Sequence, residues 1–339
     1  MNNMRIKPHP HRPLHVGSTG SRVQKVEERL ESLGYLKGAA DDRFDAGTAK
    51  AVVDYKRDHG WTGKPQGVVG ERMARSLKNI TATQASPTNG NGGKNKTPST
   101  LKGATYNVER DRKPKEVREW LGDFAKRQKL DFVQVQEIND YHKALENIPG
   151  YHLVTFPKSK DGGESGILVK DDLLAKNATY IQGEGGGWTT VRGGHAPPRA
   201  APAVQLAGWL KVVSVHQPPS VDWKNGKPVG PENRVKTYAS LSEKLLAFAK
   251  QQLKRNPDQA LLIGGDWNEP ASTQGKWSPG WIAQQAGMNT HGGVKTHGNG
   301  RIDWEMSKGC RVSNIKAGPT GGSDHNIVTF TVSRPKGKR

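Results

Sequence analysis

The stretch that most constrains this fold is residues 260–270, which read Ala-Leu-Leu-Ile-Gly-Gly-Asp-Trp-Asn-Glu-Pro. Four apolar residues followed by Gly-Gly predict a short strand that is buried on both faces, as in the centre of a layered sheet. Asp266 and Asn268 follow two residues apart, so in an extended chain their side chains point the same way. We expect the small Gly264 and Gly265 to leave room for a substrate there. Taken alone, an Asp-x-Asn after an apolar run is more often a turn cap than a catalytic pair, so other motifs must decide.

Length and charge narrow the class of protein. The 339 residues are enough for two domains, each with its own core. The formal net charge is +20, of which residues 1–80 carry +6 and the remainder +14, so the basic excess is spread along the whole chain. This charge suits a polyanionic partner or an acidic cell surface. Cys310 is the only cysteine, which excludes an internal disulfide and a cysteine-based zinc site.

The ends of the chain carry no targeting pattern. Residues 1–13 are rich in Pro, His and Arg, which predicts a flexible arm without the apolar core of an export signal. We expect a basic tail at residues 335–339. No stretch approaches the 18 apolar residues of a membrane span, so we expect no membrane partner.

Residues 14–79 show the pattern of a small helical domain. Apolar residues recur at helical spacing from Ser21, a second helix is predicted over residues 45–58, and a short third helix follows Gly67–Gly70. The motifs Val16-Gly17-Ser18, Leu33-Gly34-Tyr35, Asp42-x-Phe44, Ala51-Val52 and Gly67-Val-Val-Gly70 resemble the peptidoglycan-binding domain with three helices. The chain departs from that family at Asp45, where Gly is usual, and at Lys56-Arg57, which replace an aromatic-Gln pair. The resemblance implies peptidoglycan as the partner of residues 14–79, and a domain that only docks onto another protein is the alternative.

Residues 80–100 contain almost nothing that could pack, and their Gly, Ser, Thr, Asn and Pro content predicts a flexible linker. Beyond the linker, strands and helices mix. The patterns predict strands at residues 104–108, 131–137, 151–156, 166–170, 205–216, 260–265 and 326–332. They predict long helices at residues 113–130 and 232–253, with apolar residues on one stripe. Helices that cover the outer faces of sheets indicate a layered α/β sandwich.

Polar groups stand at the ends of the predicted strands of this second domain. The motifs, in chain order, are Tyr106-Asn107-Val108, Gln136-Glu137, Val215-His216, Gly265-Asp266-Trp267-Asn268, Ile302-Asp303-Trp304 and Ser323-Asp324-His325. Together they resemble the endonuclease/exonuclease/phosphatase superfamily over residues 101–334. The resemblance implies a deoxyribonuclease-I-like, four-layered α/β (α+β) sandwich behind the small all-α domain.

The resemblance also implies a divalent metal. Cleavage of a phosphodiester needs a positioned water and neutralised charge on the phosphoryl oxygens, and a hard cation assists both. Magnesium prefers one or two carboxylates with waters and substrate oxygens, and manganese or calcium are alternatives. Glu137 is the leading ligand, with Asp324 close by and Asn107 assisting or holding the phosphate.

Two histidines are the expected proton carriers. His325 can take or give a proton near neutral pH, and the resemblance makes Asp303 the group that fixes its tautomer. His216 is expected to be the opposing acid or base. The resemblance also implies that Glu164 orients His216. The alternative is that Glu164 is only a carboxylate in a turn.

Other residues are expected to hold the substrate. Asp266 and Asn268 orient the water and bind the scissile phosphate. Arg199 is placed to grip a phosphate, and Arg192 is equally placed. We expect His195, His291 and His297, which lie in Gly-rich stretches, to be solvated.

These features favour a metal-dependent nuclease that prefers DNA to RNA, because the basic charge of the second domain suits nucleic acid. A phosphatase or phospholipase of the same superfamily is the alternative, as is a wall-binding protein with a non-catalytic nuclease-like domain. A peptidoglycan hydrolase is disfavoured because neither paired glutamates in a lysozyme-like context nor a His/Asp/Cys zinc set is present. We expect a monomer. A wall-binding unit without an export signal suggests a bacteriophage-associated protein, or one released by lysis to the cell wall, and the host cytoplasm is the other location.

Overall fold

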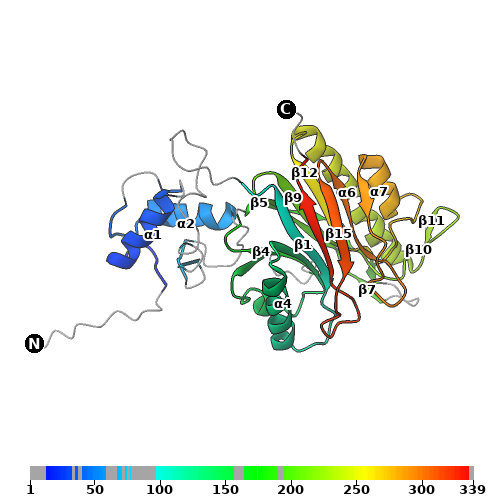
Figure 1. Cartoon of the computed structure of the whole chain (residues 1–339), viewed down its shortest axis with the longest axis horizontal. Coiled ribbons are helices and arrows are strands. Elements are labelled where there is room, and N and C mark those ends of the chain that lie inside the picture. The colour runs from blue at the N-terminus through cyan, green and yellow to red at the C-terminus, as the bar shows by residue number, and fades with distance from the viewer. Residues whose placement is uncertain are drawn as a thin grey trace, which may run out of the picture. The chain divides into compact units, whose positions relative to one another are not determined.

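The computed structural model describes residues 13–32, 35–36, 40–58, 67–70, 73–74, 77, 97–155, 164–173, 175–188 and 194–335. The chain divides into two compact units, Met1–Lys96 and Thr97–Arg339 (Figure 1). Within the described residues, no helix is long and apolar enough to cross a membrane. The expected arm at residues 1–13 lies almost wholly outside the described residues, as do most of the linker and residues 336–339 of the tail.

The smaller unit contains two described helices, α1 (Ser21–Ser32) and α2 (Ala46–Asp58). Their apolar stripes form one buried core, whose members on the two helices are Val23, Val26, Leu30, Ala51, Val52 and Tyr55. Of the expected third helix, Met73 and Leu77 are helical and buried, and the residues around them lie outside the described part of the chain.

Asp45 has a structural role in this unit. Its Oδ1 accepts a hydrogen bond from the backbone N–H of Thr48 at 2.8 Å. A carboxylate in this position satisfies an N–H group that the first turn of α2 leaves without a helical partner. Asp45, which stands where the resembling family usually has Gly, therefore caps the N-terminus of α2.

The larger unit contains two six-stranded sheets. In spatial order, the first sheet comprises β15 (Arg311–Ala317), β16 (Val328–Ser333), β1 (Thr100–Asn107), β2 (Phe132–Gln136), β4 (Ser165–Lys170) and β3 (Tyr151–Thr155). The second comprises β13 (Asn289–His291), β14 (Asp303–Lys308), β12 (Ala260–Asp266), β9 (Leu210–His216), β8 (Ala200–Leu206) and β5 (Ala175–Gln182). Two short hairpins are β6 (Gly187–Trp188) with β7 (His195–Ala196), and β10 (Asp222–Lys224) with β11 (Lys227–Val229).

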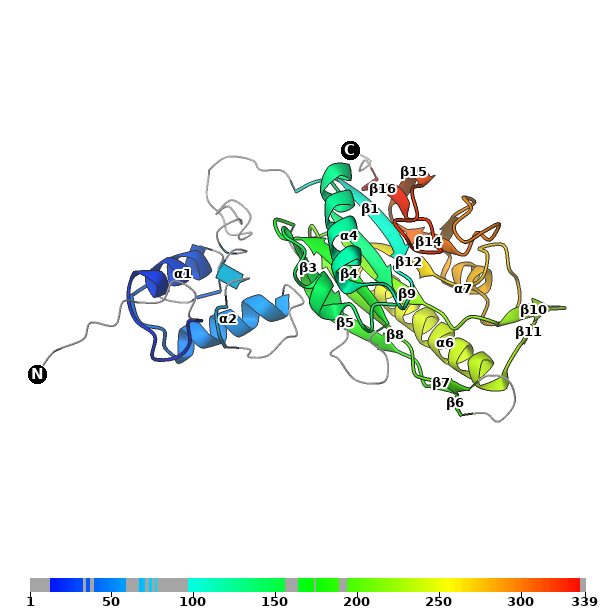
Figure 2. The same ribbon diagram turned by 90° about the horizontal axis from the view of Figure 1, so that it is seen from below.

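Helices cover the outer face of each sheet, so the unit has four layers. The first sheet packs against α4 (Pro114–Gln128) and α5 (His142–Leu145), and the second packs against α6 (Glu232–Arg255) and α7 (Pro279–Ala286) (Figures 1 and 2). Three separate apolar cores fill the spaces between these layers. The four-layered sandwich expected from the sequence is confirmed.

The alternation of side chains along the central strands determines where the polar groups lie. In β12, Leu261 and Ile263 face the helices, while Ala260 and Leu262 face the other sheet. Because side chains alternate with a period of two, Asp266 continues the inward-facing series. The same alternation holds in β1, β2 and β9. In each of these strands the residues that face the other sheet are apolar at the start of the strand and polar at its carboxyl end. The space between the sheets is therefore apolar at one end and polar at the other.

The predicted strand at residues 205–216 is wrong as a single element. The structure has a hairpin, in which β8 ends at Leu206 and β9 begins at Leu210. Ala207 and Gly208 take positive φ angles of 47° and 70°, which reverses the chain. Ala-Gly is not one of the strong turn pairs, so the periodicity masked the turn. Strands β5, β13, β14 and β15 and the four strands of the two short hairpins were not predicted. Asp303 and His325 do not end strands as expected, because Asp303 begins β14 and His325 precedes β16.

Candidate active site

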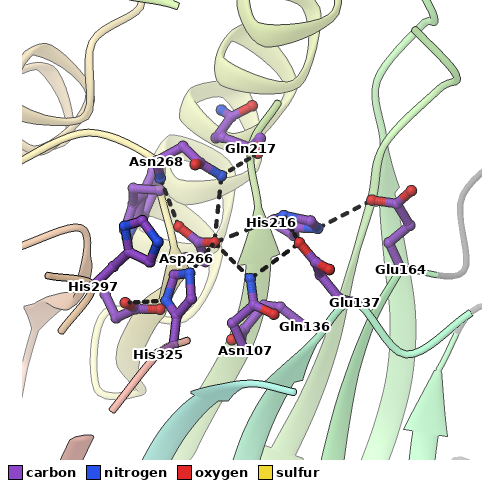
Figure 3. A network of polar contacts seen from close by, with 12 residues as sticks. Asn107, Gln136, Glu137, Glu164, His216, Gln217, Asp266, Asn268, His297 and His325 are labelled. Atoms are coloured by element: carbon purple, nitrogen blue, oxygen red, sulfur yellow. Dashed lines mark hydrogen bonds and ion pairs between the residues drawn. The ribbon is translucent and has the colours of Figure 1, made fainter. Parts of the chain in front are cut away.

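The polar end of the space between the sheets brings together residues from neighbouring strands. In the first sheet, Asn107 of β1 lies opposite Gln136 of β2. In the second sheet, Asp266 of β12 lies between His216 of β9 and Asp303 of β14. Because β1 runs parallel to β2, and β9 parallel to β12, all these residues reach one edge of the sandwich (Figure 3).

Asn107 joins the two sheets. Its Nδ2 donates hydrogen bonds to Asp266 Oδ2 at 2.9 Å and to Glu137 Oε1 at 3.3 Å. Its Oδ1 accepts a hydrogen bond from the backbone N–H of Glu109 at 3.0 Å. The amide therefore turns its nitrogen toward the carboxylates, an orientation suited to holding them or a phosphate oxygen.

Glu137 follows β2 directly and has a positive φ of 58°, which is uncommon for a residue with a side chain. Its carboxylate lies 3.8 Å from His216 Nε2 and accepts a hydrogen bond from the backbone N–H of Arg110 at 3.1 Å. The side chain keeps 24% of its surface exposed. It is a partly open carboxylate at the end of a buried strand, where a constrained backbone is consistent with a functional role.

His216 is held from behind by Glu164, whose Oε2 lies 3.1 Å from the histidine Nδ1. Glu164 also contacts Arg199, and its Oε1 accepts a hydrogen bond from Arg110 Nη2 at 2.6 Å. Burial, followed by the positive charge of Arg199, lowers the pKa of His216 to about 4. At neutral pH the imidazole is therefore uncharged. The contact expected between Glu164 and His216 is present.

His325 has the opposite electrostatic environment. Its Nδ1 lies 2.8 Å from Asp303 Oδ2, and its Nε2 lies 4.0 Å from Asp266 Oδ2. Burial alone would lower the pKa of His325, but the hydrogen bond to Asp303 and the charges of Asp303, Asp266 and Asp324 raise it to about 9. The ring is protonated at neutral pH, and Asp303 fixes the proton on Nδ1.

Asp266 lies between the two histidines. Its Oδ2 is 3.8 Å from His216 Nε2, and burial followed by the charge of Asp303 raises its pKa. Asn268 does not continue the strand, as the sequence suggested, because its φ of 51° turns the chain. Its backbone N–H donates to Asp266 Oδ1 at 2.8 Å, and its Nδ2 donates to the backbone oxygen of Gln217 at 2.9 Å. Asn268 therefore reaches Asp266 through a turn.

Asp324 contacts two histidines of the site, His325 and His297. Its Oδ1 is 3.9 Å from His325 Nε2, and its Oδ2 is 3.3 Å from His297 Nε2. The rings of His297 and His325 lie 4.8 Å apart between centroids. His297 is exposed, as expected, but it also contacts a residue of the site.

The other two histidines differ from each other. His291 Nε2 lies 2.8 Å from Ser307 Oγ, and burial lowers the pKa of His291, so this ring is not simply solvated. His195 is exposed and lines the pocket beside Glu137. Arg192 lies outside the described residues.

Gly264 and Gly265 do not leave space for a substrate, contrary to the sequence-based expectation. A Cβ on Gly264 would lie 1.9 Å from the Glu305 carboxylate, and one on Gly265 would lie 2.1 Å from the backbone oxygen of Val215. Glu305 of β14 is fully buried, and burial raises its pKa well above the ordinary value. Gly264 therefore makes room for a buried, neutral carboxyl group behind the site, and Gly265 makes room for the backbone of the neighbouring strand β9.

Several residues of the site were missed in the sequence. The alternation Phe-Val-Gln-Val-Gln in residues 132–136 could have indicated the inward-facing Gln134 and Gln136. The same period of two from Asp303 could have indicated Glu305. Arg110 and His297 come from loops, and nothing in their local sequence distinguishes them.

The donor set fits a hard divalent cation. Glu137 offers a partly open carboxylate, and Asn107 keeps that carboxylate in place. Within the described residues, two groups bring three ligand atoms within 4.8 Å of one another: His297 with Asp324 and His325, and Asp266 with Asp303 and His325. The second group offers two carboxylates and Glu137 offers a third, and such oxygen donors are what magnesium or manganese prefers, whereas the first group offers two imidazoles and one carboxylate. That Glu137 and Asp324 hold one metal together stays a prediction.

Comparison with known proteins identifies the families whose patterns the two units match. Residues 104–325 match the family model described as "Endonuclease/Exonuclease/phosphatase family", and residues 19–77 match "Putative peptidoglycan binding domain". No curated protein matches the chain. An endonuclease/exonuclease/phosphatase from Bacteroides vulgatus has a similar fold, with 15% identity and a TM-score of 0.51 over 70% of this chain and 100% of that structure. The human Nocturnin catalytic domain shows 12% identity and a TM-score of 0.48 over 70% of this chain and 95% of that structure.

Proposed function

The chain belongs to the endonuclease/exonuclease/phosphatase family, and we propose that it is a divalent-metal-dependent phosphodiester hydrolase, specifically a nuclease that prefers DNA. Enzymes of this family generally hydrolyse phosphodiesters or phosphate esters and typically depend on a divalent metal. The observation that carries the proposal is the arrangement around Asp266, whose carboxylate meets Asn107, His216 and His325 from three different strands or loops.

The metal, when bound at Glu137, supplies positive charge to the phosphoryl oxygens and to the attacking water. Arg199 holds the scissile phosphate by donating hydrogen bonds to its oxygens, and Asn107 joins it when a phosphate oxygen takes the place of the Glu137 carboxylate as an acceptor of its Nδ2–H. Asp266, whose pKa is raised, accepts a proton from the attacking water, and Asn268 fixes the orientation of this carboxylate.

His325 supplies the complementary group. Because Asp303 keeps it protonated, its Nε2–H donates to the phosphoryl or leaving oxygen, where negative charge develops. His216 is uncharged and buried, and with Glu164 and Arg199 it forms the opposite wall of the site. Asp266 as the proton acceptor and His325 as the proton donor, 4.0 Å apart, together supply the two proton transfers that phosphodiester hydrolysis needs.

The preference for nucleic acid rests on charge. Two exposed basic clusters lie at the ends of α4 and α6: Lys126, Arg127 and Lys129, and Lys250, Lys254 and Arg255. Basic residues in these positions also complement the helix dipoles, so they support the proposal only together with the net charge of +14 beyond residue 80. Incubation with plasmid DNA, structured RNA and a phosphoinositide, with magnesium or with chelator, tests this choice. Magnesium-dependent cleavage of the phosphoinositide alone would establish the phospholipase or phosphatase alternative.

The match at residues 19–77 supports a second proposal, that the smaller unit binds the cell-wall polymer. This unit would concentrate the hydrolase near the wall. A bacteriophage protein, or a protein released by lysis, is the context that this combination of units fits best.

A further inference from the structure

A pocket of about 440 Å³ adjoins the proposed active site on the side of Glu137 and His216. It is lined by both of these residues and extends to the first turns of α6, where Arg234 and Thr237 contribute to its wall. It is therefore continuous with the place where the scissile phosphate is proposed to bind, and a substrate that occupies the site extends into it.

Three arginines line this pocket: Arg110, Arg199 and Arg234. Glu164 contacts Arg199 and Arg110, and Glu137 lies 3.8 Å from Arg110, so two carboxylates offset two of the three positive charges. Arg234 has no acidic partner in the described structure. The pocket therefore holds one uncompensated positive charge before any metal binds, which favours an anionic ligand.

Arg234 is held in place by its neighbours. Its Nη1 donates to the backbone oxygen of Pro219 at 3.3 Å and to Ser220 Oγ at 3.0 Å. Both of its side-chain hydrogen bonds to described residues use Nη1, so Nε and Nη2 remain to bind a ligand. A guanidinium that is already oriented loses little freedom when it binds two oxygens of a phosphate.

One part of the remaining wall is apolar. Pro197, Pro218 and Pro219 line the pocket together with Ala196. These rigid rings offer a surface for a sugar or a base, beside the guanidinium groups that would bind its phosphate. The pocket thus presents two surfaces that match two parts of one nucleotide unit.

We propose that this pocket is a second phosphate subsite, in which Arg234 binds a phosphate group one nucleotide away from the phosphate that is cut. The inference rests on the proposed nuclease function and specifies its substrate: a chain with at least two phosphates. The second phosphate is either an internal phosphodiester or a terminal phosphomonoester.

Short thymidine oligonucleotides test this proposal with the full chain and magnesium. The reference substrate is TpT, which has one phosphate. Two further sets of substrates change the second phosphate. Trimers in which one charged linkage is replaced by a neutral methylphosphonate change an internal phosphodiester. Dimers that carry a 5′- or 3′-terminal phosphate provide a phosphomonoester instead. The variants are Arg234→Gln and, as a matched control, Lys236→Gln, which removes an exposed positive charge from the same helix turn.

We expect the wild type to prefer one substrate with a second charged phosphate, and Arg234→Gln to reduce that preference in kcat/KM about tenfold, as the loss of one charge-assisted contact does. Lys236→Gln keeps the preference. The proposal is overturned if Arg234→Gln slows TpT by the same factor as the longer substrates, or if the wild type shows no preference. Preference for a terminal phosphate over an internal one identifies the phosphomonoester as the ligand.

A binding measurement separates this proposal from the catalytic one. Inorganic phosphate is titrated calorimetrically into the full chain in the presence of EDTA. Affinity that falls about tenfold in Arg234→Gln but not in Lys236→Gln supports the subsite, even if no phosphodiester is cleaved and the nuclease proposal fails. Equal affinity in all three proteins overturns it.

Discussion

Asn107 Nδ2 donates a hydrogen bond to Asp266 Oδ2 at 2.9 Å, which joins the end of β1 in one sheet to the end of β12 in the other. The two residues are 159 positions apart in the sequence. Their contact exists only when the two sheets pack face to face, so the geometry of the site depends on the core between them. The apolar residues that precede the site in each strand form this core between the sheets and so hold the site residues together.

The pair Asp303–His325 is expected to be necessary for activity. Asp303→Asn removes the charge that keeps His325 protonated, and His325→Ala removes the proton donor. Each variant should lower kcat about a hundredfold or more, as the loss of a general acid or base does. Steady-state hydrolysis of plasmid DNA with magnesium measures the effect, and circular dichroism checks the fold.

His297→Ala is the matched histidine variant. His297 is half-exposed and lies 3.3 Å from Asp324, but it has no carboxylate equivalent to Asp303. We expect its loss to reduce kcat less than about tenfold, because only the position of an exposed aspartate changes. A loss as large as that of His325→Ala would place His297 among the groups that carry the reaction.

Gly264 and Glu305 are expected to be coupled in stability. Gly264→Ala puts a methyl group against the Glu305 carboxylate, and overpacking of this kind costs about 1–3 kcal/mol. In a Glu305→Ala background the same methyl group has space, so the cost of Gly264→Ala should fall. A double-mutant cycle with urea unfolding measures this coupling. Strictly additive effects would contradict the packing that the structure shows.

Lys211 gives a prediction about pH. It is buried, and burial lowers its pKa from 10.5 to about 8. Between these values the unfolded chain holds the proton and the folded chain does not, so stability should rise as pH increases from 8 to 10.5. Lys211→Met should remove this rise and stabilise the protein at pH 7, by at most roughly 3 kcal/mol.

Tryptophan fluorescence in urea at several pH values follows the larger unit, because eight of the nine tryptophans lie in residues 97–339. Lys224→Met, which replaces an exposed lysine, serves as the control and should keep the rise. A wild-type stability that falls from pH 8 to 10 would show that Lys211 stays charged in the folded protein.

The two units are expected to be separable. Residues 97–339 should fold and cleave plasmid DNA as well as the full chain does in solution, because the site is formed within that unit alone. Only the full chain should sediment with nucleic-acid-free cell-wall sacculi at physiological salt. If the full chain ignores sacculi, and removal of residues 1–96 instead weakens cleavage in a salt-dependent way, the smaller unit binds DNA.

The sequence allowed the layered sandwich to be predicted for a physical reason, while the roles of the site residues came from the resemblance to the family. Asn107, His216 and Asp266 each end an apolar run, so the pattern of burial itself indicates where the polar groups emerge. Arg110 and His297 could not be found in this way, because loops bring them to the site and no periodicity marks their direction. The Gly264-Gly265 pair was misinterpreted because the groups that need the space lie on the neighbouring strands, Glu305 on β14 and Val215 on β9, and local sequence does not show which strands are neighbours.

The central claim is that Glu137 supports metal-dependent hydrolysis of a phosphodiester, and its most direct test is the rate at which the full chain hydrolyses bis(p-nitrophenyl) phosphate. Glu137→Gln keeps the shape of the side chain and removes its charge, while Glu116→Gln changes an exposed carboxylate on α4 and serves as the control. We predict hydrolysis with magnesium and none in EDTA, a loss of about a hundredfold or more in Glu137→Gln, and no change in Glu116→Gln. Undiminished hydrolysis in EDTA, or by Glu137→Gln with magnesium, would contradict the account.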